Sequence, residues 1–303
     1  LQGCHPFRAV LEAGRSSSVM ADLLRELGGE VKMANALQVK AIAQARIKTD
    51  KRDSRTLAHL LRAELIPEIY QRGEANRQAQ RVLRARAYWV SKQTEIKNKI
   101  RALLAQQTEE IRQEVDKRRD GLFSGRGLEC LRRLPVEGPD KMVLDDLVQG
   151  YQETQGHIQT SDGWVGKLYG ELEEAARIDT IPGFATTLSV LAVVEIADVK
   201  RFSSPAHLHS YAGVIPSTYA SGERTYHGRI TKQGSAWLRW AALEAVYPAI
   251  KKDLALRVLY NRLAKRKGPN AAKIAVARRL LTIIYRILTE KRTYLPDMNR
   301  SAA

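Results

Sequence analysis

Two aspartates, Asp50 and Asp53, stand three residues apart where a helix is predicted to begin, in the run 48–54 (Lys-Thr-Asp-Lys-Arg-Asp-Ser). At this spacing both carboxylates lie on one helix face, with Cβ atoms about 5–6 Å apart. Such a pair could share Mg²⁺, which prefers oxygen ligands and usually takes only one or two protein carboxylates. The same residues also suit an ordinary helix N-cap with an acidic first turn. Spacing alone leaves both interpretations open.

Glu12 is a third carboxylate, at the end of the apolar run 9–13 (Ala-Val-Leu-Glu-Ala), which predicts a strand. A carboxylate at a buried strand end needs a partner or a metal to offset its desolvation, whereas an exposed strand end needs neither. Together, Glu12, Asp50 and Asp53 would supply three carboxylates of a four-carboxylate Mg²⁺ site.

A Pro-Gly turn at 181–185 (Ile-Pro-Gly-Phe-Ala) stands between two predicted helices. Backbone N–H groups at such a helix-hairpin-helix turn hold a DNA phosphate. The usual hairpin has a second glycine two positions after the first, where this chain has Ala185. Phosphate contact at Gly183 and a plain helix–helix turn are therefore both open.

The elements that must position these residues begin with an α/β segment. Strands are predicted at 7–11 and 31–34, with a helix at 18–27 between them and another from Asp50 until Pro67. Apolar residues then recur at helical spacing from 75 to 115, which predicts one long amphipathic helix.

After a looser stretch at 121–139, a returning helix is predicted at 142–172, so that the two long helices form an antiparallel hairpin or coiled coil. From Asp179 onward we expect a mostly helical region of short helices that ends in strongly basic ones. The predicted domains are 1–70, 71–178 and 179–303.

The composition points to a nucleic-acid partner. The 303 residues carry a formal net charge of +17, with a pI near 10.0, and such a field attracts polyanions. No apolar run approaches the roughly 20 residues needed to span a bilayer, so we expect no membrane association. Cys4 and Cys130 lack the spacing of a disulfide framework or a zinc site, which fits a reducing cytoplasm.

The most specific pattern lies between 202 and 234. It consists of Phe-Ser-Ser-Pro at 202–205, Tyr-Ala-Gly-Val-Ile-Pro at 211–216, Ala-Ser-Gly-Glu at 220–223 and Gly-Arg-Ile-Thr-Lys-Gln-Gly at 228–234. With the Pro-Gly turn before it, this order resembles the C-terminal domain of the DEDD transposases of insertion-sequence family 110, which are relatives of the Piv-type DNA invertases. Upstream, Glu12, Asn35 and the 48–53 stretch resemble that family's catalytic domain, whose fold is similar to RuvC and RNase H. The resemblance covers nearly the whole chain.

The resemblance implies that Glu12, Asp50 and Asp53 are the second, third and fourth members of an acidic tetrad that binds Mg²⁺. It implies that Ser221 is a nucleophile that attaches covalently to DNA; the alternative is a plain Ser-Gly turn. It also implies phosphate contacts for Gly183, Arg224, Arg229, Lys232 and Lys48. No role is assigned to His207, His209 or His227.

The first tetrad aspartate would lie on a strand before Leu1, so we expect the chain to begin inside a domain. The resulting hypothesis is a bacterial DNA transposase or recombinase, cytoplasmic and associated with the nucleoid, that forms a dimer or tetramer. A guide RNA is a further partner, because some members of the family use one. The alternatives are a catalytically inactive nucleic-acid-binding remnant and a RuvC-like metal nuclease.

Overall fold

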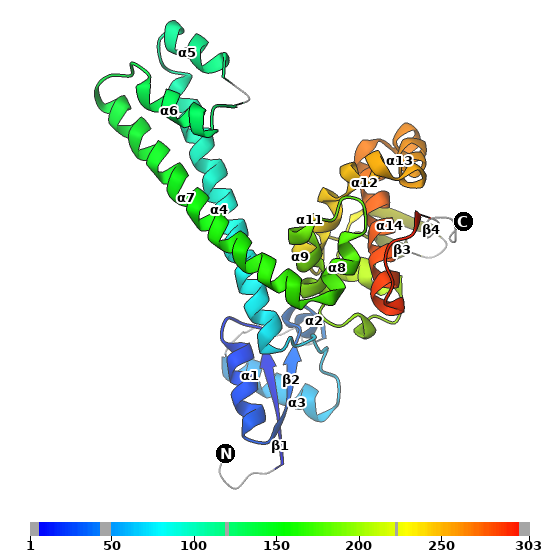
Figure 1. Cartoon of the computed structure of the whole chain (residues 1–303). Helices are drawn as coiled ribbons and strands as arrows, with labels where there is room; N and C mark the ends of the chain where they lie inside the picture. The colour runs from blue at the N-terminus through cyan, green and yellow to red at the C-terminus, as the bar shows by residue number, and fades with distance from the viewer. Residues whose placement is uncertain (1–5, 43–49, 119–120, 222–223, 297–303) are drawn as a thin grey trace. The chain divides into compact units, whose positions relative to one another are not determined.

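The structure is a computed structural model that describes residues 6–42, 50–118, 121–221 and 224–296 (Figure 1). It divides into two units, Leu1–Gly73 and Glu74–Ala303. Each unit is described by itself below.

The first unit contains a parallel pair of strands joined by a helix, which confirms the predicted α/β order. Strand β1 (Phe7–Glu12) pairs with β2 (Gly29–Ala34), with Glu12 opposite Ala34, and α1 (Ser17–Glu26) connects them. Because side chains alternate along a strand, one face of the pair is apolar and packs with Ala21 of α1. This small core contains Ala9, Leu11, Val31, Met33 and Leu24.

Charged side chains occupy the other face of this strand pair. Helix α2 (Ala36–Ile42) follows β2, and α3 (Asp50–Arg62) contacts β1. Beyond the end of α3, the Glu64 carboxylate accepts a hydrogen bond from Lys32 Nζ at 3.1 Å and pairs with Arg8. The far end of α3 is thus attached to the charged face.

In the second unit, α4 (Glu74–Leu104) and α7 (Gly138–Glu171) form the predicted antiparallel helical hairpin (Figure 1). Trp89 of α4 stacks on His157 of α7 with ring centroids 4.0 Å apart. Nearer the tip, Gln107 Nε2 donates to Asp140 Oδ2 at 2.9 Å. Toward the tip, later residues of the first arm of the hairpin thus meet earlier residues of the second, as in an antiparallel pair.

The prediction of one helix from 75 to 115 is wrong in its last part. Helix α4 ends at Leu104, and a separate helix, α5 (Glu109–Asp116), begins after Thr108. A threonine followed by two glutamates is a helix-start signal, and the apolar periodicity concealed it. The looser stretch also holds a helix that was not predicted, α6 (Gly125–Arg133), in which the hydroxyl of Ser124 caps the N–H of Gly127 at 3.2 Å.

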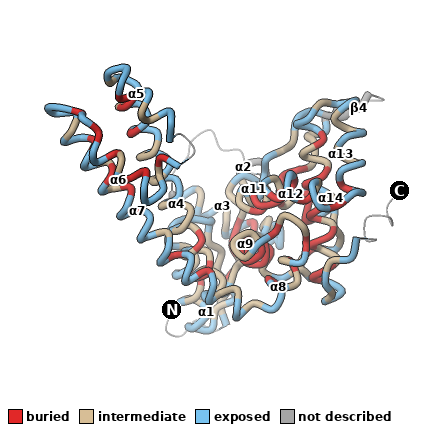
Figure 2. Tube along the Cα trace, turned by 45° about the horizontal axis from the view of Figure 1, so that its top comes forward, coloured by how far each residue is buried: buried red, intermediate tan, exposed pale blue. Residues whose placement is uncertain are grey.

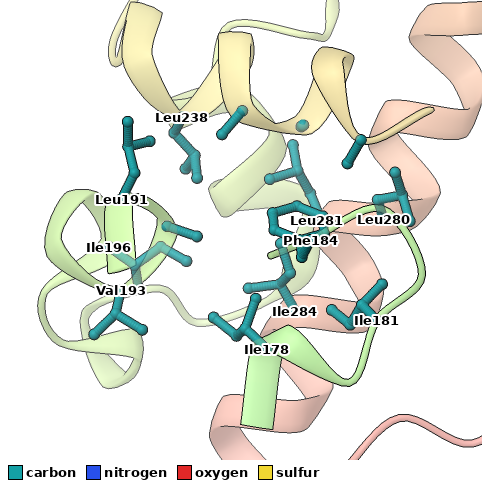
Figure 3. Packing of buried hydrophobic residues seen from close by; sticks show 14 of the residues in the cluster. Ile178, Ile181, Phe184, Leu191, Val193, Ile196, Leu238, Leu280, Leu281 and Ile284 are labelled. Carbon is teal, nitrogen blue, oxygen red and sulfur yellow. The ribbon is translucent and has the colours of Figure 1, made fainter. Parts of the chain in front are cut away.

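The C-terminal helices gather around a core that also includes the base of the helical hairpin. They are α8 (Glu173–Asp179), α9 (Thr186–Ile196), α10 (Pro205–Tyr211), α11 (Ala236–Glu244), α12 (Val246–Lys252), α13 (Leu254–Lys267) and α14 (Pro269–Glu290), with a short 3₁₀ turn at Val199–Arg201. Buried side chains run through α9, α11 and α14 (Figure 2). Figure 3 shows residues such as Phe184, Leu238 and Ile284 from different segments meeting in this core.

The same core includes Ala79 and Leu83 of α4 and Val165 of α7. The domain boundaries at 70 and 178 remain predictions. The chain is mostly helical, as expected. A β-hairpin of β3 (Pro216–Ser221) and β4 (Arg224–Ile230) was missed. Within the described residues, no helix combines the length and the apolar character needed to cross a membrane.

Candidate functional site

Ser221 lies at the end of the β3–β4 hairpin. It is the last residue of β3 and pairs with Arg224, the first residue of β4. Residues 222 and 223 between them, and the side chains of Ser221 and Arg224, lie outside what the structure describes. The backbone therefore places this serine where two antiparallel strands turn.

Two backbone segments, 211–215 and 231–235, meet at the base of this hairpin, and we call them the clasp. The N–H of Ser235 donates to the carbonyl of Tyr211 at 2.7 Å, and the N–H of Lys232 donates to the carbonyl of Gly213 at 3.1 Å. Gly213 and Gly234 have φ of 65° and 79°, a conformation that favours glycine. A Cβ at Gly234 would overlap the Tyr211 carbonyl, and one at Gly213 would overlap the carbonyl of Gln233. The two glycines of the sequence pattern therefore let the segments touch.

Glu195 of α9 holds both segments of the clasp from inside the protein. Its side chain is buried, with a residue exposure of 3%. The hydroxyl of Ser235 donates to Oε2 at 2.7 Å, and the hydroxyl of Tyr211 donates to the Glu195 main-chain carbonyl at 3.2 Å. Ser235 also caps α11 by accepting from the N–H of Leu238 at 3.1 Å. The base of the serine hairpin is thus anchored to a buried carboxylate.

The charge of Glu195 is balanced from α4. Arg84 forms an ion pair with Oε1, and Gln80 Nε2 donates to the same oxygen at 3.1 Å. The Arg84 guanidinium lies 3.9 Å from the ring centroid of Trp237 in α11. Sequence reasoning missed this network, although a lone glutamate inside the apolar run 188–196 signals a charge that needs a partner.

Glu12, the first predicted metal ligand, ends β1 and is exposed. Of the two alternatives that the sequence left open, an exposed strand end is the one found, so burial does not demand a partner for Glu12. By strand alternation it shares the face of Arg8 and Lys32, whose charges are already paired with Glu30, Glu64 and Glu68. Glu12 itself forms no ion pair with any residue that the structure describes.

Asp53 is half-buried on α3. Helical spacing places it on the same side as Leu57, Leu60 and Leu61, and the last two are buried. The side chain of Asp50 and all of Lys48 lie outside the described residues, so the three-carboxylate arrangement stays a prediction. Among described residues, no group of three or more His, Cys, Asp or Glu side chains could hold a metal ion.

Gly183 lies in the turn between α8 and α9, which form the predicted pair of helices. Its φ is 95°, and a Cβ there would overlap the carbonyl oxygen of Ala245. Close packing thus requires this glycine whether or not it meets a phosphate, and the phosphate contact stays a prediction. Arg229 and Lys232 are exposed near the hairpin, as residues that hold phosphates must be.

Comparison with known families identifies the chain. A model described as Transposase, for the DEDD transposases of IS110, matches residues 2–108. A second model, described as Transposase IS116/IS110/IS902 family, matches residues 175–261, which include Glu195 and the serine hairpin. The chain belongs to the IS110 transposase family.

Relatives of this family member include the transposase for insertion sequence element IS1111A of Coxiella burnetii, 30% identical over 40% of this chain and 35% of the relative. The transposase for IS1328 of Yersinia enterocolitica is 22% identical over 96% of the chain and 86% of the relative. The pilin gene-inverting protein of Moraxella bovis is 26% identical over 88% of the chain and 74% of the relative. The chain thus matches about a third of the first of these proteins and most of the other two.

Two of the three histidines to which the sequence assigned no role make contacts within the fold of this family member. His209 is buried, and its Nε2 lies 3.0 Å from the hydroxyl of Thr282. Burial, together with the nearby charge of Arg278, lowers the pKa of His209 to about 4. The Nδ1 atom of His207 lies within hydrogen-bond distance of the hydroxyls of Ser203 and Ser204, at 3.0 and 2.9 Å. The side chain of His227 is not described.

Proposed function

We propose that this chain is a DNA transposase or recombinase that cuts and rejoins DNA, with Ser221 as the nucleophile that forms a covalent link to a DNA phosphate. The observation that carries the proposal is the position of Ser221 at the end of a hairpin whose base is clasped and anchored to Glu195. A reacting hydroxyl must be held in a precise geometry, and a hairpin that is fixed at its base supports this proposal. The family match supports the DNA substrate.

Glu12, Asp50 and Asp53 are proposed to hold Mg²⁺, in a catalytic unit similar to RuvC and RNase H. The fit rests on their oxygen donors, on the parallel strand pair that ends at Glu12, and on the absence of an ion-pair partner for Glu12 among described residues. When bound, the cation would polarise a scissile phosphate and neutralise developing charge. The role of the protein is to supply the carboxylates from β1 and α3.

The cations near the serine are proposed to bind phosphates. Arg229 and Lys232 are exposed. The other residues proposed to contact phosphates are Arg224, Lys48 and Gly183. Arginine presents paired N–H donors to a phosphate, whereas lysine acts as a point charge. The same proposal includes a guide RNA as a partner and a location at the bacterial nucleoid. It also includes assembly into a dimer or tetramer through the helical hairpin, which would form a coiled coil.

The deciding experiment is a search for a covalent protein–DNA adduct. The chain is incubated with Mg²⁺ and labelled element-end DNA, with and without structured RNA from the element, then denatured and resolved by gel. A second preparation carries an added N-terminal strand with an aspartate, to supply the predicted fourth carboxylate. An adduct is expected that requires Mg²⁺ and is abolished by Ser221→Ala.

Ser217→Ala is the matched control, because Ser217 lies on the same strand, far from the turn, and its hydroxyl donates to the carbonyl of Arg229. This variant is expected to keep the adduct. Cleavage that is indifferent to Ser221→Ala would replace the proposal with a metal nuclease. DNA binding without an adduct in either preparation would point to an inactive nucleic-acid-binding protein.

A further inference from the structure

Six exposed cations gather on α12 and α13, and we call them the basic face. Lys251 and Lys252 end α12, while Arg262, Lys265, Arg266 and Lys267 lie along the second half of α13. None of the six forms an ion pair with any residue that the structure describes. They are positive charges with no internal counterion in the described part of the chain.

The sequence around the basic face is almost free of acidic residues. Between Glu244 and Glu290 the chain has eleven Lys or Arg residues and a single acidic one, Asp253. Asp253 is buried; its Oδ1 accepts from the N–H of Leu256 at 2.8 Å, and its Oδ2 accepts from the hydroxyl of Tyr294. This carboxylate caps α13 and does not neutralise the basic face.

Exposed cations on the helical hairpin are different, because many of them are paired. Arg81 pairs with Glu74, Lys99 with Glu95, and Arg112 with Glu109. Most of the unpaired positive charge that makes up the +17 net charge therefore lies in the C-terminal part of the sequence. An unpaired cluster of this kind attracts a polyanion more strongly than paired charges do.

Helix α13 presents Arg262 and Lys265 on its outer side, with Arg266 beside them and Lys267 as its last residue. Leu256 is buried, and Leu259 and Tyr260 are partly buried toward the core. Leu254, Val258, Arg262 and Lys265 recur at three- and four-residue steps and are exposed, so they form one stripe on the outer side. No aromatic residue lies on this side of α13, which is described throughout. Tyr247 of α12 is exposed, but its ring is already in contact with Tyr260 and with the ammonium group of Lys273.

We propose that the basic face binds the phosphate backbone of duplex DNA, as a second contact separate from the serine hairpin. A helix of this kind fits the major groove of B-DNA, which is about 12 Å wide. The major groove of A-form RNA is too narrow for side chains to enter, and surfaces for single strands usually offer aromatic rings. Arg262 to Lys267 lie outside both matched family segments, which end at residues 108 and 261. The choice of DNA rests on the proposed function.

The test is the salt dependence of binding to a 30-base-pair DNA duplex, followed by fluorescence anisotropy. In one variant four cations of α13 are neutralised: Arg262→Gln, Lys265→Gln, Arg266→Gln and Lys267→Gln. Each lost phosphate contact removes about 0.9 from the slope of log affinity against log salt. We expect the slope to fall by about 2 to 4, and the affinity at 0.1 M salt to fall at least about tenfold.

The matched control neutralises four cations that are already paired: Arg81→Gln, Lys99→Gln, Arg112→Gln and Lys117→Gln. It removes the same formal charge, and we expect its slope to change by less than about 1. Equal losses in the two variants would reduce the effect to net charge and overturn the proposal. An unchanged slope in the α13 variant would also overturn it, as would a loss confined to a structured RNA competitor.

Failure of the basic face and failure of the serine mechanism give different results. Ser221→Ala is expected to keep the full salt slope, since it removes no cation. A reduced slope in the α13 variant without any covalent adduct would support the basic face and refute the nucleophile. An adduct that forms while the slope of the α13 variant stays unchanged would support the nucleophile and refute the basic face. The α13 variant and its matched control change exposed side chains, and circular dichroism before and after salt titration checks that the helices persist.

Discussion

Removing the cation beside Glu195 should destabilise the second unit far more than a surface substitution would. Arg84→Met keeps the aliphatic part of the side chain, but it removes the guanidinium that lies over Trp237 and leaves a buried carboxylate without this ion-pair partner. Gln80 and Ser235 would still donate to it. Breaking a buried ion pair by removing one partner costs about 3–5 kcal/mol.

Removing the carboxylate charge instead should cost less. Glu195→Gln keeps an oxygen acceptor for Ser235 or Gln80, and it leaves Arg84, whose side chain is 31% exposed and therefore reaches water. We expect a loss of about 1–2 kcal/mol, typical of a weakened hydrogen bond to a group that was charged. The difference between the two variants follows from burial, because Glu195 has no access to water that could replace Arg84.

The measurement is urea denaturation followed by tryptophan fluorescence and circular dichroism, on the two single variants and on Arg84→Met/Glu195→Gln. The double variant removes both charges, so it should be more stable than Arg84→Met alone, with a coupling free energy of about 2 kcal/mol. Lys92→Met is the control, since Lys92 pairs with Glu95 on the solvent side of α4; its cost should stay within about 0.5 kcal/mol. Additive costs, or a harmless Arg84→Met, would refute the view that Glu195 is buried as an ion.

Three further outcomes are expected. Because the pKa of His209 is lowered to about 4 in the fold, the unfolded chain binds the proton first, and stability should fall between pH 6.5 and 4 by up to about 3 kcal/mol; pH-dependent denaturation should lose this component in His209→Gln. Gly234→Ala should cost about 3 kcal/mol or more, through its positive φ and its overlap with Tyr211, and hydrogen exchange should rise at the amide of Ser235. Gly163→Ala, in an open position on α7, should instead raise the free energy of unfolding by about 0.5–1 kcal/mol, and thermal denaturation should show a slightly higher melting temperature.

Apolar periodicity was sufficient to predict α1, α3, the two long helices of the hairpin and both strands of the parallel pair. It failed where helix boundaries depend on capping, as at Thr108, and where a helix is short, as in α6. The β3–β4 hairpin was missed because its residues are largely polar, and none of its described side chains is buried. Such strands are specified by their neighbours, here the clasp, and a periodicity window does not contain those contacts.

The site shows a similar division. The ordered motif predicted where Ser221 lies in the chain and led to the family, but it gave no reason for its glycines. Those reasons are contacts between segments about twenty residues apart in the sequence, such as the meeting of Gly234 with Tyr211. Glu195 is more remote still, since its partners Arg84 and Ser235 come from α4 and from the start of α11. A single sequence carries no record of such pairings.

The reason that a buried ion pair belongs at this place lies in the weakness of the hairpin itself. A two-stranded hairpin is marginally stable in water, whereas a nucleophile that is misplaced by about 1 Å loses a large factor in rate. The clasp fixes both strands at one end, and Ser235 and Tyr211 attach the clasp to Glu195. Each of these bonds is directional, unlike apolar packing, so the network defines the orientation of the hairpin as well as its attachment. On the proposed function, Ser221 presents its hydroxyl to a phosphate, and this orientation favours that role, at the cost of burying a carboxylate that then requires Arg84.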